Sequence, residues 1–521
     1  MFNTLLVGGI IVDGTGNVGF PGAVAIDSDR IRILTGDVSS IDAGHILDVS
    51  GCMVAPGFID VHTHSDLMTL AEPLNEPKVY QGITTELVGQ DGVGYAPLSE
   101  SSLLTMVRYY AGINGSPPLD YNWRSMAEYL QLFEGTTSVN IGSLMPNSCP
   151  RLEVIGWDNR PATADEIRRM QEIVRQAMSE GALGLSSGLN YAPGVYASTE
   201  ELIQLCKTVA AHGGVYCTHV RYDLGDRALD PFREAINIGK RSGCPVQLTH
   251  YATNYATRGK ADRLLELVDK ARLVGLDVTV DSYPWPAGST VLHMCVPVWA
   301  HDGGPQALLE RLKNPAERAK MRTQGAGSVL NYSEMVISAI GTEKNRWCEG
   351  RTVAEIADEL KKDPWDTVCD LIIDEDLYVS YYVFSGHMDD VKLIMRHPSQ
   401  MFCSDGLRVG GRPNPRTYGT YPKVLGQMVR DEKVLPMEQA IRKMTSFPAQ
   451  RFGLKDRGIL RDGMKADVVV FDPLTVSSTA TFENPKQYPL GIEYVFVNGE
   501  MVVEQGTHTG ATPGRSVTRR V

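Results

Sequence analysis

The sequence predicts an α/β fold, a (β/α)8 TIM-like barrel accompanied by a small β domain. Apolar, strand-like runs alternate with helical stretches through the middle of the chain, and eight such runs can be found. This alternation is typical of βα units with a parallel sheet. Several of the runs are followed by histidine or aspartate, and the active site of such a barrel lies where its strands end. The strand ends are therefore where we expect the functional residues.

Composition restricts the function. The 521 residues are 43% hydrophobic and 21% charged, which indicates a globular chain with a large core. The net charge of −12 argues against nucleic acid or an anionic membrane as a partner and favours a small-molecule substrate. The nine cysteines lack CxxC spacing, and the chain shows neither a signal peptide nor a membrane-spanning run. We expect a cytoplasmic protein.

The two ends of the chain predict strands of a different kind. Residues 3–55 form short apolar runs broken by glycine and aspartate, and a similar texture returns at 466–472 and 492–499. Both ends would supply a small antiparallel sheet that becomes one β-sandwich domain, because open sheet edges need partners. The predicted division is 1–56 and 451–521 for this domain, with 57–450 as the barrel.

The barrel strands and helices follow in order. Thr163 precedes the helix predicted to end at residue 179, and Glu166 three residues later completes a capping box. Two further helices are predicted at 199–211 and 261–274. The eight predicted strands are 53–61, 84–88, 138–144, 182–185, 214–218, 246–249, 277–280 and 401–403.

The connection between the seventh and eighth strands is longer than a barrel requires. Residues 285–395 contain a Pro/Gly-rich entrance, a turn at 347–350 and two charged helical stretches at 305–321 and 352–362. A long insertion at this face is usually a lid or a wall of the substrate pocket. A subunit contact is the alternative, which leaves a homo-oligomer open.

Residues suited to metal binding gather at the predicted strand ends. His62 and His64 are separated by one residue at the end of a strand, so both side chains point to the same side. Four more candidates follow other strands: Asp91, His219, His250 and Asp405. Imidazole and carboxylate groups converging on one point are costly without a shared cation. Four histidines and two acids suit Zn²⁺ or a similar ion better than Ca²⁺ or Mg²⁺.

These residues lie in recognisable motifs. The start Pro-Gly-Phe-Ile-Asp-Val-His-Thr-His at 56–64 resembles the amidohydrolase superfamily, and nearly the whole chain is similar to the N-acyl-D-amino acid deacylases (D-aminoacylases) within it. The supporting stretches are Thr-Thr-Glu-Leu-Val-Gly at 84–89, Gly-Leu-Ser-Ser-Gly-Leu at 184–189, Thr-His-Val-Arg at 218–221, Tyr-Pro-Trp-Pro-Ala-Gly-Ser-Thr at 283–290, Ser-Asp-Gly at 404–406, Asn-Pro-Arg at 414–416 and Gly-Met-Lys-Ala-Asp at 463–467.

The resemblance implies a ligand set for one or two metal ions. His62, His64 and Asp405 would form one position and His219 with His250 the other, while Asp91 would sit between them. Asp91 replaces the cysteine of related D-aminoacylases. At the end of strand four, Ser-Ser-Gly at 186–188 replaces the carboxylated lysine of many superfamily members, so that bridging group is missing.

The resemblance also implies a reaction. Water activated by the metal would attack an amide carbonyl, with Asp405 as the general base; Asp405 could instead be only a ligand or a helix cap. Tyr191, Tyr283, Ser289 and Arg416 would hold the substrate, with Arg416 reaching its carboxylate. The two tyrosines could equally be packing residues.

Three departures affect substrate recognition. Ala252 stands where related chains carry a lysine, so one cation near the substrate carboxylate is missing. Asn414 replaces the first residue of a His-Pro-Arg motif, and strand three ends at Met145-Pro146-Asn147 where Gly-His is usual. Losing one cationic partner of a carboxylate costs about 1–3 kcal/mol, enough to change the preferred substrate.

Two other functions remain open. A cyclic amidohydrolase would use the same site to open a hydantoin, lactam or dihydropyrimidine ring, although such enzymes commonly carry the strand-four lysine. A metal-free scaffold would retain the barrel for interactions alone, but all six candidate ligand positions hold ligand-type residues. We predict that the substrates are linear N-acyl-D-amino acids.

Overall fold

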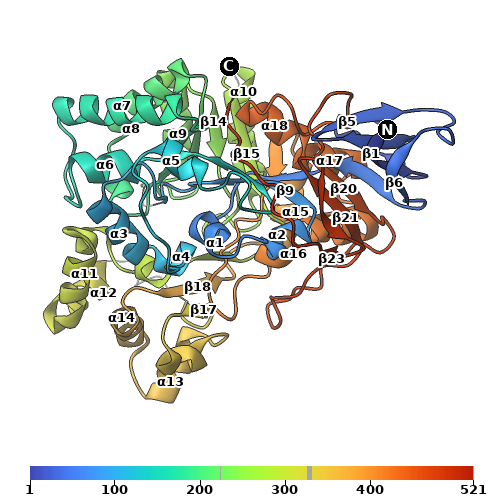
Figure 1. The fold of residues 1–521 in the computed structure, drawn as a ribbon. Helices are drawn as coiled ribbons and strands as arrows, with labels where there is room; N and C mark the ends of the chain where they lie inside the picture. Colours follow the sequence, from blue (N-terminus) through green and yellow to red (C-terminus); the bar gives the residue numbers. More distant parts are fainter. Residues whose placement is uncertain (223, 325–330, 520–521) are drawn as a thin grey trace.

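The computed structural model describes residues 1–222, 224–324 and 331–519, a mixed α/β fold (Figure 1). Residues 325–330 of the predicted insertion and 520–521 of the predicted C-terminal part lie outside the described residues, as does residue 223. In Figure 1 the blue N-terminal strands and the red C-terminal strands lie together on the right, away from the helices α6 (Ser148–Val154), α7 (Ala164–Ser179) and α8 (Thr199–Ala211).

The middle of the chain supplies parallel strands, as the sequence predicts. One sheet has the order β10-β9-β8 and the next the order β11-β12-β13-β14-β15-β19, with a single residue separating β10 from β11. The bounds are β8 Phe58–Asp60, β9 Ile83–Val88, β10 Asn140–Ser143, β11 Met145–Pro146, β12 Gly184–Gly188, β13 Val215–His219, β14 Val246–Leu248, β15 Val278–Ser282 and β19 Gln400–Phe402.

Beyond the ends of β8 and β19 the two segments remain paired. The Asp405 amide donates to the His62 carbonyl at 2.8 Å, and the His64 amide donates to the Gly406 carbonyl at 3.0 Å. The first and last parallel strands of the chain are therefore neighbours where the candidate ligands lie.

Helices follow most of these strands. α7 (Ala164–Ser179) begins after Thr163 with the predicted capping box, and α8 (Thr199–Ala211) and α10 (Ala261–Leu273) confirm the other two predicted helices. The remaining helices of this part are α1 Asp66–Ala71, α2 Glu76–Val79, α3 Glu100–Tyr109, α4 Ala111–Asn114, α5 Met126–Gln131, α6 Ser148–Val154, α9 Asp230–Ser242, α15 Met388–Arg396, α16 Arg416–Lys423, α17 Met437–Met444 and α18 Ser446–Phe452.

The predicted strand 53–61 is two strands in two sheets. β7 (Met53–Pro56) pairs with β2 (Ile10–Ile11) and β20 (Val468–Phe471), whereas β8 pairs with β9. Gly57 lies between them, and a Cβ there would stand 2.2 Å from the Thr84 hydroxyl oxygen. Because only glycine allows this close approach, the chain crosses from one sheet to the other at this residue.

Strands from both chain ends form one seven-stranded sheet, β23-β22-β21-β20-β7-β2-β3, beside a four-stranded sheet, β5-β4-β1-β6. The prediction of a purely antiparallel arrangement is wrong, because β1 pairs with β6 and β2 with β7 in parallel. Longer connections, not hairpins, join these pairs. The bounds are β1 Phe2–Val7, β2 Ile10–Ile11, β3 Phe20–Pro21, β4 Ala23–Asp27, β5 Arg30–Leu34, β6 Ala43–Asp48, β20 Val468–Phe471, β21 Ile492–Val497, β22 Glu500–Glu504 and β23 Thr507–His508.

The insertion contains more regular structure than predicted. Its three-stranded antiparallel sheet, β16 (Gly288–Val291), β18 (Val379–Val383) and β17 (Met335–Ile340), has no counterpart in the sequence analysis. The helix predicted at 305–321 is two helices, α11 (Gly304–Lys313) and α12 (Pro315–Gln324), because Pro315 cannot continue α11 and holds Asn314 extended. α13 (Val353–Leu360) and α14 (Pro364–Asp374) follow. Within the described residues, no helix has the length and apolar character needed to cross a bilayer.

Candidate metal centre

All six predicted ligands lie at the same end of the parallel strands. His62 and His64 follow β8, Asp91 follows β9, His219 ends β13, and His250 and Asp405 come just after β14 and β19. His62, His64, Asp91 and Asp405 are at most 5% exposed. The structure brings them together as two groups, His62-His64-Asp91-Asp405 and Asp91-His219-His250, with the ligand atoms of each group within 4.8 Å of one another.

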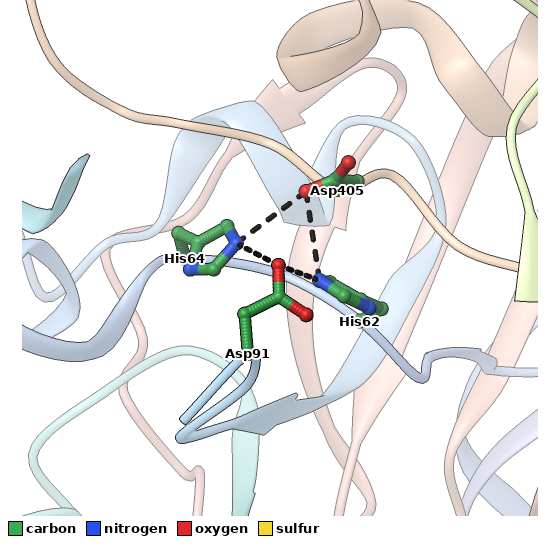
Figure 2. Close-up of side chains that lie close together, drawn as sticks. All are labelled: His62, His64, Asp91 and Asp405. Atoms are coloured by element: carbon green, nitrogen blue, oxygen red, sulfur yellow. Dashed lines mark ion pairs between the residues drawn. The ribbon is translucent and has the colours of Figure 1, made fainter. Parts of the chain in front are cut away.

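The first group has the spacing of ligands around one ion (Figure 2). His62 Nε2 lies 3.5 Å from both Asp91 Oδ2 and Asp405 Oδ1, and His64 Nε2 lies 3.6 and 3.4 Å from the same two oxygens. Ligand atoms held about 2.0–2.1 Å from a tetrahedral zinc ion are roughly 3.3–3.4 Å apart. The four side chains therefore match the geometry of a zinc site.

The second group shares Asp91 with the first. Asp91 Oδ2 lies 3.3 Å from His250 Nε2 and 3.7 Å from His219 Nδ1, and these two ring nitrogens are 2.9 Å apart. The oxygen that faces His62 and His64 thus also faces the second pair of histidines. A carboxylate in this position can join two metal sites.

The polar atoms of the first group fit a cation. Within the part of the chain that the structure describes, neither ring nitrogen of His62 makes a hydrogen bond, although the residue is fully buried. Buried polar atoms are nearly always satisfied, so an unsatisfied one indicates a missing partner. With nitrogen and carboxylate donors on all sides, a divalent metal of the zinc type suits this set.

Three of the six candidates have strained backbones. Asp91, His250 and Asp405 have φ angles of 54°, 35° and 46°, in the left-handed region that non-glycine residues rarely adopt. The His250 amide is held by Asp281 Oδ1 at 2.7 Å. Such strain persists only where the surroundings enforce it, and it concentrates at functional sites.

Within the two groups, the carboxylates and the imidazoles shift one another's pKa values. Burial alone would lower the pKa of His64 and His250, but Asp91 and Asp405 raise both pKa values to about 9. Burial lowers the pKa of His219, with Asp91 opposing it. Burial would raise the pKa of Asp91, yet His62 and His250 bring it well below its usual range. Without a metal ion, protonated imidazoles thus stabilise the buried carboxylates of this cluster.

Two of the predicted substrate residues lie beside Asp405. Arg416, the first residue of α16, is fully buried, and its Nη2 lies 2.9 Å from Asp405 Oδ2. The guanidinium carbon lies 4.4 Å from the centre of the Tyr283 ring. Burial would raise the pKa of Asp405, but Arg416 and His62 hold it below its usual range.

The other two residues predicted to bind substrate, Tyr191 and Ser289, come from different elements. The Tyr191 ring centre lies 5.0 Å from that of His219, and its hydroxyl is 2.8 Å from the Thr290 hydroxyl on β16. Ser289 precedes Thr290 on the same strand and is partly exposed.

Where a lysine is missing, serines fill the space. Ser186 Oγ accepts from the Gly92 amide at 3.1 Å, and Ser187 Oγ lies 2.7 Å from the Tyr216 hydroxyl. Gly188 follows, and a Cβ there would stand 1.8 Å from the Asp91 carbonyl oxygen. Strand four therefore supports the loop that carries Asp91 and supplies no charged group.

The sequence analysis missed Asp281, which is fully buried on β15. Besides accepting from the His250 backbone amide, its Oδ1 lies 3.7 Å from His62 Nδ1, and its Oδ2 accepts from Nε2 of the Gln247 side chain at 2.8 Å. Carboxylates behind ligand histidines commonly fix ring orientation. An acid inside the apolar run Val-Thr-Val-Asp-Ser at 278–282 was the available signal.

Comparison with known proteins identifies the family of this chain. The amidohydrolase family model matches residues 45–503. The chain is 35% identical to D-aminoacylase of Alcaligenes xylosoxydans xylosoxydans, over 99% of this chain and 98% of that protein. A solved structure of a D-aminoacylase with a binuclear metal centre is 34% identical to this chain. It superposes with a TM-score of 0.84 over the full length of both chains. N-acyl-D-glutamate deacylase from Bordetella bronchiseptica, complexed with zinc and a phosphonate inhibitor, is 31% identical with a TM-score of 0.84, again over all of both chains. This chain belongs to the amidohydrolase family.

Proposed function

We propose that this protein is a metal-dependent hydrolase that cleaves a C–N amide bond and removes the acyl group from N-acyl-D-amino acids. One observation carries the proposal: two groups of histidine and aspartate side chains share Asp91, and the first of them has the separation of zinc ligands. The full-length similarity to a D-aminoacylase and an N-acyl-D-glutamate deacylase supports the linear N-acyl substrate.

Zn²⁺ is the proposed ion. His62, His64, Asp91 and Asp405 would hold one ion, and Asp91, His219 and His250 would hold a second. When bound, such an ion lowers the pKa of water and polarises a carbonyl group. The zinc complex of the related N-acyl-D-glutamate deacylase supports this choice.

Asp405 is the proposed general base. Its Oδ1 faces His62 and His64, so it can accept a proton from water beside the metal groups and pass it to the departing amine. Its Oδ2 is held by Arg416, which fixes the carboxylate and keeps it ionised. The reaction then ends with a free carboxylic acid and a D-amino acid.

Arg416, Tyr283, Tyr191 and Ser289 are the proposed substrate residues. Nη2 of Arg416 is engaged by Asp405, but among the described residues Nε and Nη1 make no hydrogen bond, although the side chain is fully buried. A buried guanidinium with free N–H groups suits a substrate carboxylate. Tyr191 and Ser289, joined through β16, would form the opposite wall.

We also propose how the elements are organised around this site. With β10 and β11 counted as one interrupted strand, the parallel strands from β8 to β19 would close as an eight-stranded barrel, which the backbone hydrogen bonds between the segments after β8 and β19 support. Residues 57–450 would be the catalytic domain with 285–395 as its lid, and 1–56 with 451–521 the small β domain. The nine free thiols are typical of a cytoplasmic enzyme.

The test is a direct comparison of substrates with the zinc-loaded protein. We expect hydrolysis of N-acetyl-D-leucine or N-acetyl-D-glutamate, and much slower reaction of their L enantiomers, measured as release of the free amino acid. Hydantoin and dihydrouracil serve as ring substrates. Reaction with the ring compounds alone would replace the deacylase proposal by a cyclic amidohydrolase.

A further inference from the structure

A buried lysine that is not a candidate ligand lies directly behind the first metal group. Lys78, in the short helix α2, is fully buried. Its ammonium lies 2.8 Å from Asp60 Oδ2, 2.7 Å from Thr63 Oγ1, 2.9 Å from Ser404 Oγ and 3.0 Å from Glu86 Oε1. An ammonium has three protons, so these four acceptors use its full capacity.

Two of these partners sit between or beside candidate ligands. Thr63 separates His62 from His64, and Ser404 immediately precedes Asp405. The Ser404 amide also donates to Asp60 Oδ1 at 2.8 Å, and the Gly406 amide donates to Ser404 Oγ at 3.1 Å. One cation thus joins the segment after β8 to the segment after β19.

The connection extends to β9 and α2. Ser65 Oγ donates to Glu86 Oε1 at 2.7 Å, and the Asn75 side-chain amide donates to Glu86 Oε2 at 2.9 Å. Asn75 precedes α2 with a φ of 51°, and the Lys78 side chain in α2 is buried in the core. Burial would lower the pKa of Lys78, but Asp60 and Glu86 raise it, so the side chain remains charged.

We propose that Lys78 is a positioning residue that sets the metal affinity of the His62-His64-Asp91-Asp405 group by fixing the backbone of three of its members. Among the described residues, its four polar partners include none of the six candidate ligands, so it acts through Thr63 and Ser404. This inference rests on the proposed function, because it assumes that the group binds a metal ion.

The strained backbone of Asp405 makes such support necessary. With φ at 46°, Asp405 would relax if the preceding Ser404 were released. The same ammonium restrains Thr63, so His62 and His64 would lose their common direction as well. Affinity for the ion should therefore fall when Lys78 is removed, even where the fold survives.

The test measures Co²⁺ binding by wild-type protein and by Lys78→Met. Zn²⁺ has a filled d shell and gives no visible bands, so Co²⁺ is the probe, titrated against a competing chelator while the visible spectrum is recorded. We expect Lys78→Met to weaken Co²⁺ binding about 10- to 100-fold, with an altered spectrum, because outer residues typically have effects of this size. Wild-type affinity and spectrum in this variant would overturn the inference.

Lys443→Met is the matched control. Lys443 is 4% exposed and donates to the Met395 and His397 carbonyls and to Gln400 Oε1 at 2.7, 2.6 and 3.0 Å. It therefore supports the beginning of β19, whereas Lys78 supports the segment beyond its end. We expect this variant to lose thermal stability but to keep wild-type Co²⁺ affinity within about 2-fold. Equal loss of affinity in both variants would attribute the effect to general destabilisation and contradict the inference.

A milder variant covers the case in which Lys78→Met does not fold. Thr63→Val keeps the side-chain volume and removes only the hydroxyl that Lys78 contacts. We expect Co²⁺ affinity to fall about 3- to 10-fold with little change in melting temperature, and unchanged affinity would overturn the inference. If wild-type protein binds no Co²⁺, the proposed function fails and this inference fails with it.

Discussion

Arg416 and Asp405 form a buried ion pair in which Nη2 lies 2.9 Å from Oδ2. The other carboxylate oxygen, Oδ1, lies 3.5 Å from His62 Nε2 and 3.4 Å from His64 Nε2. One carboxylate thus faces a permanent cation on one side and the metal group on the other. The pair fixes the direction of Asp405, and its charge lowers the pKa of Asp405.

Replacing this arginine should shift the pH dependence of catalysis. In Arg416→Met the pKa of Asp405 rises, because the positive charge that favours the carboxylate is gone. Asp405 then becomes protonated at higher pH, so the acidic limb of kcat/KM should move upward by about one pH unit or more. Arg151→Met, which removes an arginine paired with Glu201 elsewhere, should leave the limb in place. An unshifted limb in Arg416→Met would show that Asp405 is not the group observed.

Asp405→Asn separates the role of base from that of ligand. We expect kcat to fall by about 10²- to 10⁴-fold, because the amide cannot accept the proton. The measurement is steady-state hydrolysis at increasing zinc concentration, with metal content determined in parallel. If excess zinc restores the rate, Asp405 is only a ligand and another group must act as the base.

Asp91 should determine how many ions the protein holds. In Asp91→Ala the second group retains only His219 and His250, which is too few ligands for tight binding. Elemental analysis should therefore show a loss of about one equivalent of zinc relative to wild type. Asp91→Cys keeps a ligand-type side chain and should bind more zinc than Asp91→Ala. Equal zinc content in the wild type and both variants would argue against a shared ligand.

Metal binding should strengthen as the pH rises. In the metal-free protein the pKa values of His64 and His250 are raised to about 9, so both rings carry protons at neutral pH. An ion must displace those protons, and affinity should increase up to about tenfold per pH unit for each proton released, levelling off above pH 9. Isothermal titration in buffers of different ionisation enthalpy counts the protons.

Less than about 0.2 equivalents of metal in protein purified without chelators would favour the metal-free scaffold.

A buried ion pair that includes none of the candidate ligands should make a large contribution to the free energy of unfolding. Arg151 Nη1 lies 2.6 Å from Glu201 Oε2, and both side chains are at most 1% exposed. Arg151→Met leaves Glu201 buried without its partner and should cost about 3–5 kcal/mol in the free energy of unfolding. Lys270→Met, which breaks the exposed pair with Glu266, should cost less than about 0.5 kcal/mol in the same urea titrations. Similar losses in both would contradict this reading of burial.

The sequence determined the order of strands and helices and the chemical type of the site. The alternation of apolar runs predicted the parallel strands, and the capping box at Thr163 and Glu166 located the start of α7. The residues expected to bind metal follow the ends of strands, where local periodicity is informative. The spacing of His62 and His64 also indicated that both side chains point to the same side, because side-chain direction along a strand depends only on local geometry.

Only the tertiary structure decided how these side chains meet. The break at Gly57 depends on the distance to Thr84, and the parallel pairing of β1 with β6 depends on chain reversal elsewhere. The position of Arg416 against Asp405, and of Lys78 behind Thr63 and Ser404, joins segments that are distant in sequence. Such contacts depend on packing between segments, and no local pattern of residues encodes the distance between two atoms brought together by the whole fold.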